Sequence, residues 1–126
     1  MLVLDSGGVS RLSARTKTAA ALIRSLVDHE LWPPVVPTMV LVVSLQGHGG
    51  RDANANRFLK TCIIDPEVSE ATARRAAQLR RLARAGSAVD ALLVALAEPG
   101  GIVITGDRAD LDELAAHADR VAIEVI

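Results

Sequence analysis

Short runs of apolar residues that alternate with helical segments constrain the fold of this chain most. Each run is too short for a helix, and most are bounded on both sides by glycine, proline or polar residues, which is typical of a buried strand. The runs are Leu2–Leu4, Val35–Val36, Cys62–Ile64, Ile102–Ile104 and Val121–Val125. Buried strands separated by helices predict a parallel sheet that is covered on both faces. We therefore expect an α/β fold with a central parallel sheet of four to five short strands flanked by helices.

The segments between the strands carry apolar residues at helical spacing. Gly7 and Gly8 would let the chain turn sharply after the first strand, and Ser87 is expected to cap a nearly all-apolar, central helix. Gly47 is expected to end the helix that we predict over Met39–Gln46. In chain order we expect a helical turn at Val9–Leu12 and helices from Thr16 or Thr18 to about Asp28–Glu30, then over Met39–Gln46, Arg51–Lys60, Ser69–Arg84, Ala88–Ala97 and Leu111–Ala116.

Length and composition limit the class of protein. A chain of 126 residues predicts one domain, residues 1–126, and the net charge of −1 excludes a nucleic-acid binder that depends on bulk positive charge. Cys62 is the only cysteine, so an internal disulfide is excluded and a reducing cytoplasm is expected. No apolar run reaches the roughly 18 residues of a membrane span, and no signal segment is expected.

Three aspartates stand where ligand sites form in parallel α/β folds. Asp5 and Asp107 each follow a buried strand, and Asp90 lies one turn into the apolar helix. If the two strands are neighbours, Asp5 and Asp107 meet at one crevice beyond their carboxyl ends. Two simpler roles stay open: Asp90 as a favourable charge at a helix start, and Asp107 as the N-cap of the last helix.

Three carboxylates in one pocket would repel one another unless a cation lay among them. Mg²⁺ takes oxygen ligands, commonly one or two carboxylates together with waters and phosphate oxygens. The aspartates therefore predict a metal site that is suited to hydrolysis of phosphodiester bonds.

Four motifs in this order resemble a PIN domain, and the likeness to the small VapC toxins extends over essentially the whole chain. They are Asp5-Ser6-Gly7, the Pro37…Leu41…Leu45…Gly47 segment, Ser87-Ala88-Val89-Asp90-Ala91 and Thr105-Gly106-Asp107…Asp110. The resemblance implies a PIN-like three-layer sandwich and a toxin that is a Mg²⁺- or Mn²⁺-dependent endoribonuclease. It also implies inhibition by a cognate VapB-type antitoxin and a homodimer.

By matching position, the resemblance assigns Asp5, Asp90 and Asp107 as metal-binding, catalytic acids. Asp110 is a supporting acid in the same comparison. Ser6 falls at the small hydroxyl position after the first aspartate, and Thr105 supports the last motif.

One position departs from the family pattern. The family has a glutamate where this chain has Val43, and Gln46 one turn later offers only a neutral carbonyl. We therefore expect a weakened nuclease, and the alternative is a catalytically impaired domain that binds antitoxin or RNA. Val43 is either a natural change or a deliberate one that disarms a toxic enzyme.

Basic residues form a strip on the helix expected over Ser69–Arg84, within an arc of roughly 120°. They are Arg74, Arg80, Arg81 and Arg84, and Arg51, Arg57 and Lys60 could extend the strip. The strip is either a solvated face or a surface that neutralises RNA phosphates.

An apolar ridge on the first helices also has two interpretations. Its members are Ala19, Leu22, Ile23, Leu26, Val40 and Leu41. They either pack in the core or receive an antitoxin helix or a second copy of the chain. A third class of protein, a signalling domain with a phosphorylated aspartate, is disfavoured because its acidic pair and its lysine are missing.

Overall fold

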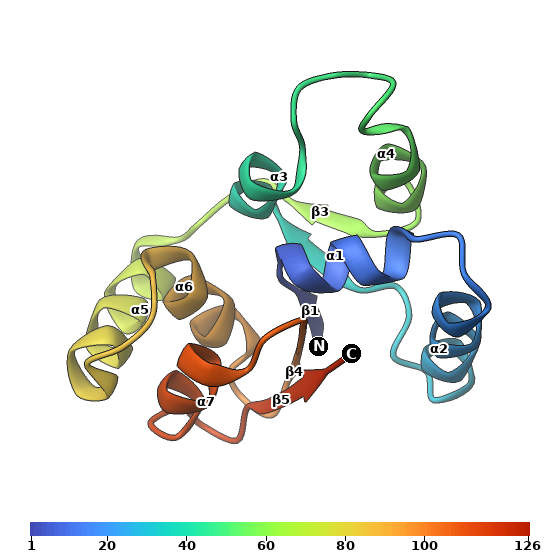
Figure 1. Cartoon of the computed structure of the whole chain (residues 1–126). Coiled ribbons are helices and arrows are strands. Elements are labelled where there is room, and N and C mark those ends of the chain that lie inside the picture. The colour runs from blue at the N-terminus through green and yellow to red at the C-terminus, as the bar shows by residue number, and fades with distance from the viewer.

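A computed structural model of the chain describes residues Met1–Ile126. Five strands form one sheet in the order β3-β2-β1-β4-β5, and every neighbouring pair is parallel (Figure 1). The strands are β1 (Leu2–Leu4), β2 (Val35–Pro37), β3 (Ile63–Asp65), β4 (Ile102–Thr105) and β5 (Ala122–Val125). The expected parallel sheet of short strands is confirmed.

Seven helices connect the strands, and they follow the expected order. They are α1 (Ser6–Ser13), α2 (Lys17–Asp28), α3 (Thr38–Ser44), α4 (Ala53–Leu59), α5 (Glu70–Ala83), α6 (Ala88–Ala97) and α7 (Ala109–Ala115). The side chains of Thr16, Ser69 and Ser87 accept hydrogen bonds from the first turns of α2, α5 and α6. These caps explain why the three helices begin where they do.

The helices form two groups about the sheet. α1 contacts β1 and β4 and also α2, α3 and α4, whereas α6 contacts the same two strands together with α5 and α7. In Figure 1, α2 and α4 of the first group lie to the right of the central strands, whereas α5, α6 and α7 lie to the left. The arrangement is an α/β fold consistent with a PIN-like three-layer sandwich. None of the helices is both long and apolar enough to cross a membrane.

The chain order reverses beside β1. From β1 the chain proceeds outward to β2 and β3, then returns to β4 on the other side of β1. Leu4 pairs with Ile104, and the Asp5 amide donates to the Ile104 carbonyl at 3.2 Å. In open parallel sheets, such a switch point is where ligands bind, beyond the carboxyl ends of the strands.

The glycines after β1 act differently from our expectation. They lie inside α1, which begins at Ser6, so the sharp turn at these glycines and the helical turn limited to Val9–Leu12 were wrong. A Cβ atom on Gly7 would lie 2.6 Å from the Gly106 amide nitrogen, and one on Gly8 would lie 2.6 Å from the Ile104 carbonyl oxygen. Since no side chain fits there, the two glycines allow the first turn of α1 to pack directly on the end of β4.

Helix α3 ends earlier than the sequence predicts. It stops at Ser44, and Leu45 is extended, so the predicted end at Gln46 with a Gly47 stop was wrong. The amides of Gln46, Gly47 and His48 instead donate to the carboxylate of Asp52 at 2.9–3.1 Å. The buried carboxylate satisfies donors that a longer helix would have used.

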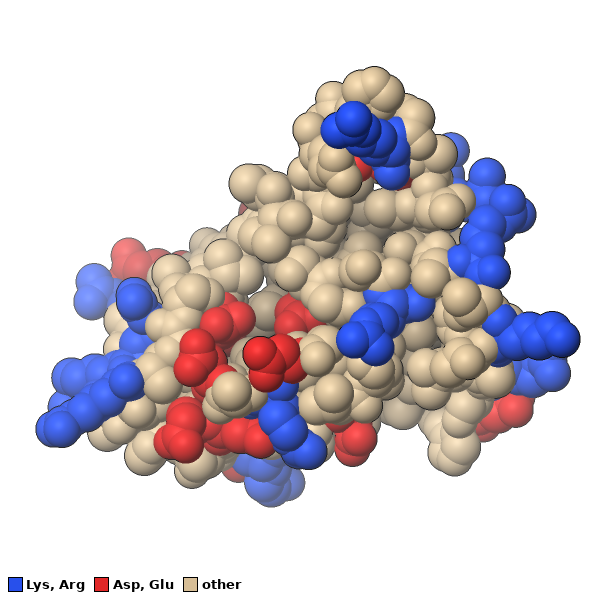
Figure 2. All heavy atoms as spheres, in the orientation of Figure 1, with Lys and Arg blue, Asp and Glu red and all other residues tan.

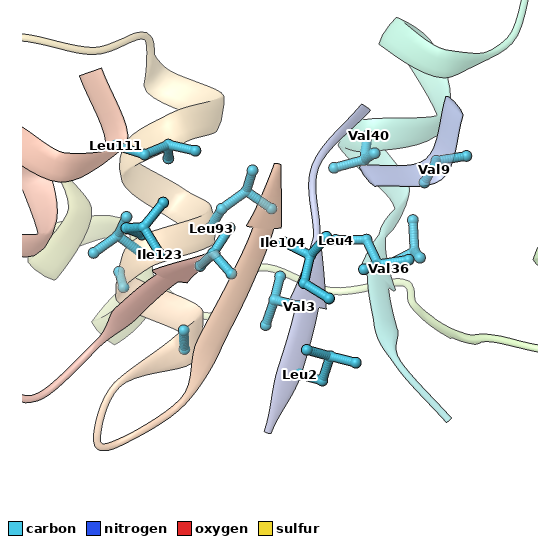
Figure 3. Packing of buried hydrophobic residues seen from close by; sticks show 14 of the residues in the cluster. Leu2, Val3, Leu4, Val9, Val36, Val40, Leu93, Ile104, Leu111 and Ile123 are labelled. Carbon is cyan, nitrogen blue, oxygen red and sulfur yellow. The ribbon is translucent and has the colours of Figure 1, made fainter. Parts of the chain in front are cut away.

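The core lies on both sides of the sheet, and β1 contributes a fully apolar strand to it. Figure 3 shows Leu4 and Val36 on one side near Val9 and Val40, and Leu93 beside Ile123 on the other. Leu93 is fully buried on α6, as expected for a central helix. The ridge residues Ala19 and Val40 are buried, while Leu22, Ile23, Leu26 and Leu41 are partly buried against the same cluster.

Replacing Leu93 with alanine should lower the free energy of unfolding by about 2–5 kcal/mol, because it leaves a cavity in a close-packed core. Urea denaturation measures this change. The control is Val27→Ala on α2, because Val27 is 50% exposed. We expect the control to stay within about 0.5 kcal/mol of the parent. Equal losses in the two variants would contradict the packing described.

Candidate functional site

A polar pocket lies at the switch point, beyond the carboxyl ends of β1 and β4. Its volume is about 350 Å³. It is lined by Asp5, Ser6, Gly7, Asp90, Thr105, Gly106, Asp107, Ala109, Asp110 and Leu111. Four carboxylates line it and no lysine or arginine does. The structure thus brings together the acids that the sequence singled out, and Figure 2 shows acidic side chains gathered over this part of the surface.

Asp5 is held by two donors from different elements. Its Oδ1 accepts from the Gly8 amide at 2.7 Å, which makes Asp5 the N-cap of α1. Its Oδ2 accepts from the hydroxyl of Thr105 at the end of β4. The Thr105 hydroxyl also accepts from the Asp107 amide at 3.1 Å. A carboxylate has about four acceptor positions, so Asp5 keeps free lone pairs while its orientation is fixed.

Asp90 and Asp107 each serve a helix start and line the pocket as well. Asp90 forms a reciprocal capping box with Ser87, each amide donating to the other side chain at 3.1 Å. Asp107 Oδ1 accepts from the Ala109 amide at 3.1 Å, although α7 has Arg108 as its N-cap residue. The second oxygen of each carboxylate has no protein donor. The capping roles and the pocket roles are therefore compatible.

The chemistry of the pocket fits a hard divalent cation. Carboxylate oxygens are the ligands that Mg²⁺ and Mn²⁺ favour, and Mg²⁺ commonly needs only one or two of them because it keeps several waters. No group of three acidic, histidine or cysteine side chains is close enough to bind one ion directly. Asp5, Asp90, Asp107 and Asp110 line the pocket, so one or two of these carboxylates could hold such an ion directly, and the others could contact it through its waters.

Val43 borders the same site. A cavity of about 280 Å³ is lined by Asp5, Ser6, Val40, Val43, Ser87, Val89, Asp90 and Leu93. Val43 is 61% exposed, so its side chain does not pack in the hydrophobic core. A longer acidic side chain at this position would have open space in a cavity that Asp5 and Asp90 also line.

The arginines of α5 lie elsewhere. Arg74 pairs with Glu70 at 3.0 Å in an exposed pair, Arg80 donates to the Gly86 carbonyl at 3.3 Å, and Arg84 has left-handed backbone after the helix. None of Arg74, Arg80, Arg81 and Arg84 lines the acidic pocket. In Figure 2, basic side chains lie to the left of the acidic cluster, over α5. Their contact with RNA stays a prediction.

Two polar clusters in the structure were not predicted from the sequence. Asp52 is 5% exposed, and the backbone donors around it, Gln46 first, hold the pKa of its carboxyl below the ordinary value. Arg75 donates two hydrogen bonds to Glu98, at 2.8 and 2.9 Å, and these lower the pKa of Glu98 and raise that of Arg75. Glu98 also accepts from the Asp119 amide at 2.7 Å, so the cluster ties α5 to the end of α6 and to the loop after α7.

Cys62 and the histidines belong to no acid cluster. Burial raises the pKa of the Cys62 thiol to about 11, which keeps the thiol protonated at neutral pH. His29 and His48 bond only to nearby backbone in exposed positions.

Replacing Thr105 with valine should destabilise the protein by about 1–2 kcal/mol, because it removes the hydroxyl that links Asp5 to the amide of Asp107 at nearly unchanged volume. Thr105 is only 1% exposed, so water cannot easily replace the lost donor. Urea denaturation of Thr105→Val, with the exposed Thr18→Val on α2 as control, measures the effect. A loss no larger than that of the control would show that the link does not support the site.

No model of a known protein family matches the chain, and no curated protein matches it in sequence. The likeness to PIN domains therefore depends on the four motifs and on the arrangement of the acids.

Proposed function

We propose that this chain is a PIN-type, VapC-like endoribonuclease that uses Mg²⁺ or Mn²⁺ and is weakened because Val43 replaces an acidic residue. One observation carries the proposal. Asp5, Asp90, Asp107 and Asp110 line a single pocket at the switch point of a parallel sheet, with no cationic side chain among them. A pocket with this charge favours a divalent cation, because one ion relieves the repulsion between the carboxylates.

The protein's own contribution is to position the oxygens. Gly8 and Thr105 orient Asp5, Ser87 orients Asp90, and the Ala109 amide orients Asp107. A divalent ion bound there would lower the pKa of a water and offset charge on the phosphate. Because the carboxylates are already oriented by local donors, little side-chain freedom would be lost when substrate binds.

Val43 is the reason that the proposed enzyme would be weak. Its side chain lines the cavity beside Asp5 and Asp90. An acidic group there could accept a proton from water or add a negative charge to the carboxylates around the ion. Valine can do neither. General acid–base groups commonly contribute a factor of about 10²–10⁴ to a rate, so the loss should be large.

An apolar cavity supports a protein partner of the VapB type. It has a volume of about 510 Å³ and lies between the α1–α2 segment and α4. Ala19 and Ile23 of the predicted ridge line it together with Trp32 and Phe58, and Arg15 and Arg57 are also at its walls. An amphipathic helix with acidic residues beside its apolar face would fit such a groove. A homodimer remains a further proposal for the apolar surface at Val42 and Val43, which are 83% and 61% exposed.

A second candidate is a binding module without catalysis. The observation that favours it is Val43 itself, since an exposed valine at a catalytic pocket supplies no reactive group. Such a domain would retain the apolar groove and bind antitoxin or RNA. Cleavage of RNA by a Val43→Glu variant separates the two candidates.

Replacing Val43 with glutamate should raise Mn²⁺-dependent cleavage of a single-stranded RNA at least about tenfold, because it adds a proton acceptor beside Asp5. The measurement is the initial rate on a labelled oligoribonucleotide, with and without excess EDTA. Val43→Gln is the matched control, since it adds the same length without the charge.

Adding Asp5→Asn to the glutamate variant should abolish the gained activity. A Val43→Glu variant that cuts RNA no faster than the parent, while remaining folded, would contradict the nuclease proposal. It would leave the binding module as the better account.

A further inference from the structure

A second polar cavity lies beside the acidic pocket. It has a volume of about 440 Å³ and lies between α1, the end of α3 and the start of α4. Ser6 and Gly7 line both this cavity and the acidic pocket, so the two hollows share the first turn of α1 as a common edge. In Figure 1, α1 passes below the loop that joins α3 to α4.

The walls of the second cavity are polar. Along α1 it is lined by Ser6, Ser10 and Ser13, whose spacing of four and three residues places them on one face of the helix. The opposite wall includes Gln46 and Asn54. Ser44, which also lines it, has a hydroxyl oxygen with no hydrogen-bond partner in the protein. The cavity therefore offers many hydrogen-bonding groups and no aromatic surface.

This cavity does not share the negative charge of the acidic pocket. It is lined by one acid, Asp52, and one base, Arg51. The Asp52 carboxylate is buried and is already satisfied by the amides of Gln46, Gly47 and His48. Arg51 is exposed, and its side chain forms no ion pair with the protein. The available charge in this cavity is therefore positive.

We propose that this cavity, defined here as the serine groove, binds the ribose–phosphate backbone of single-stranded RNA next to the acidic pocket. The inference rests on the proposed nuclease function, because it assigns a path to that substrate. Arginine, serine, asparagine and glutamine side chains are the usual contacts to phosphate and sugar. Hydroxyl and amide groups can both donate to and accept from the 2′-hydroxyl that distinguishes RNA from DNA. The volume is in the range of ordinary small-ligand sites.

The serine groove fits this role better than the α5 face does. Arg74 of α5 is paired with Glu70, and Arg75 is bound to Glu98. No residue of α5 shares a wall with the acidic pocket, whereas the serine groove shares two. A strand whose scissile phosphate lies among the acids can continue directly into the serine groove.

The test measures binding of a fluorescein-labelled oligoribonucleotide, and of its DNA counterpart, to the full chain by anisotropy in EDTA, so that cleavage plays no part. Arg51→Ala should weaken RNA binding about threefold to tenfold and reduce the slope of log Kd against log salt by about 0.7, as expected for one lost phosphate contact on a single strand. The double variant Ser10→Ala/Ser13→Ala should reduce the preference for RNA over DNA about threefold. Arg24→Ala and Ser25→Ala on the exposed surface of α2 are the matched controls.

A second measurement locates the strand directly. Photocrosslinking of a 4-thiouridine oligoribonucleotide, followed by peptide mass spectrometry, should mark residues 6–13 or 44–55. Crosslinks only on α5 peptides, or RNA binding that is unchanged in Arg51→Ala and in the serine double variant, would overturn the proposal. So would an absence of RNA binding by the parent chain.

These outcomes are separable from the proposed function. If Val43→Glu cleaves RNA but binding does not depend on Arg51 and the serines, the serine groove is wrong and the nuclease stands. If binding depends on them but Val43→Glu does not cleave, the groove stands and the chain is a binding module.

Discussion

The pairing of β1 with β4 is the interaction on which the rest of the structure depends. Because the chain returns from β3 to the opposite side of β1, two strand ends that are about one hundred residues apart in sequence become neighbours. Gly7 and Gly8 then allow α1 to approach β4 so closely that no side chain would fit between them. The acidic pocket depends on this contact, since its walls are the segments that follow β1 and β4, together with Asp90 of α6.

The same contact explains how four negative groups are tolerated at one place. Each of the three main aspartates accepts at least one hydrogen bond from an amide or a hydroxyl. They lie at the starts of helices, where the backbone amides offset part of their charge. The local structure therefore supports an arrangement that the carboxylates alone would oppose.

Much of the fold could be predicted from the sequence because its signals are local. Short apolar runs between helical segments predicted the parallel sheet, and Ser69 and Ser87 marked helix starts correctly. Thr16 and Thr18 were both possible starts of α2, and the structure has Thr16 as the N-cap. The grouping of Asp5 and Asp107 could also be anticipated, because strand ends in a parallel sheet share one edge. The resemblance to PIN domains added Asp90 and Asp110 to this group, and both line the acidic pocket.

The misses have a common physical cause, which is contact between distant residues. Gly7 and Gly8 were interpreted as a turn because a sequence does not show that β4 will lie against them. The end of α3 was misplaced because Asp52, eight residues beyond Ser44, takes the amides that would have continued the helix. Arg75 and Glu98 are separated by 23 positions, so no local sequence pattern predicts their ion pair. The serine groove requires three elements to be placed in space before its lining can be seen.

A titration with Mn²⁺, followed by electron paramagnetic resonance of the free ion, tests the central claim most directly. The account predicts that the parent chain binds Mn²⁺ and that Asp5→Asn loses this binding, whereas Asp28→Asn at the exposed end of α2 retains it. A parent chain that binds no Mn²⁺, or an Asp5→Asn variant that binds it as tightly as the parent does, would contradict the claim that these aspartates form a cation site.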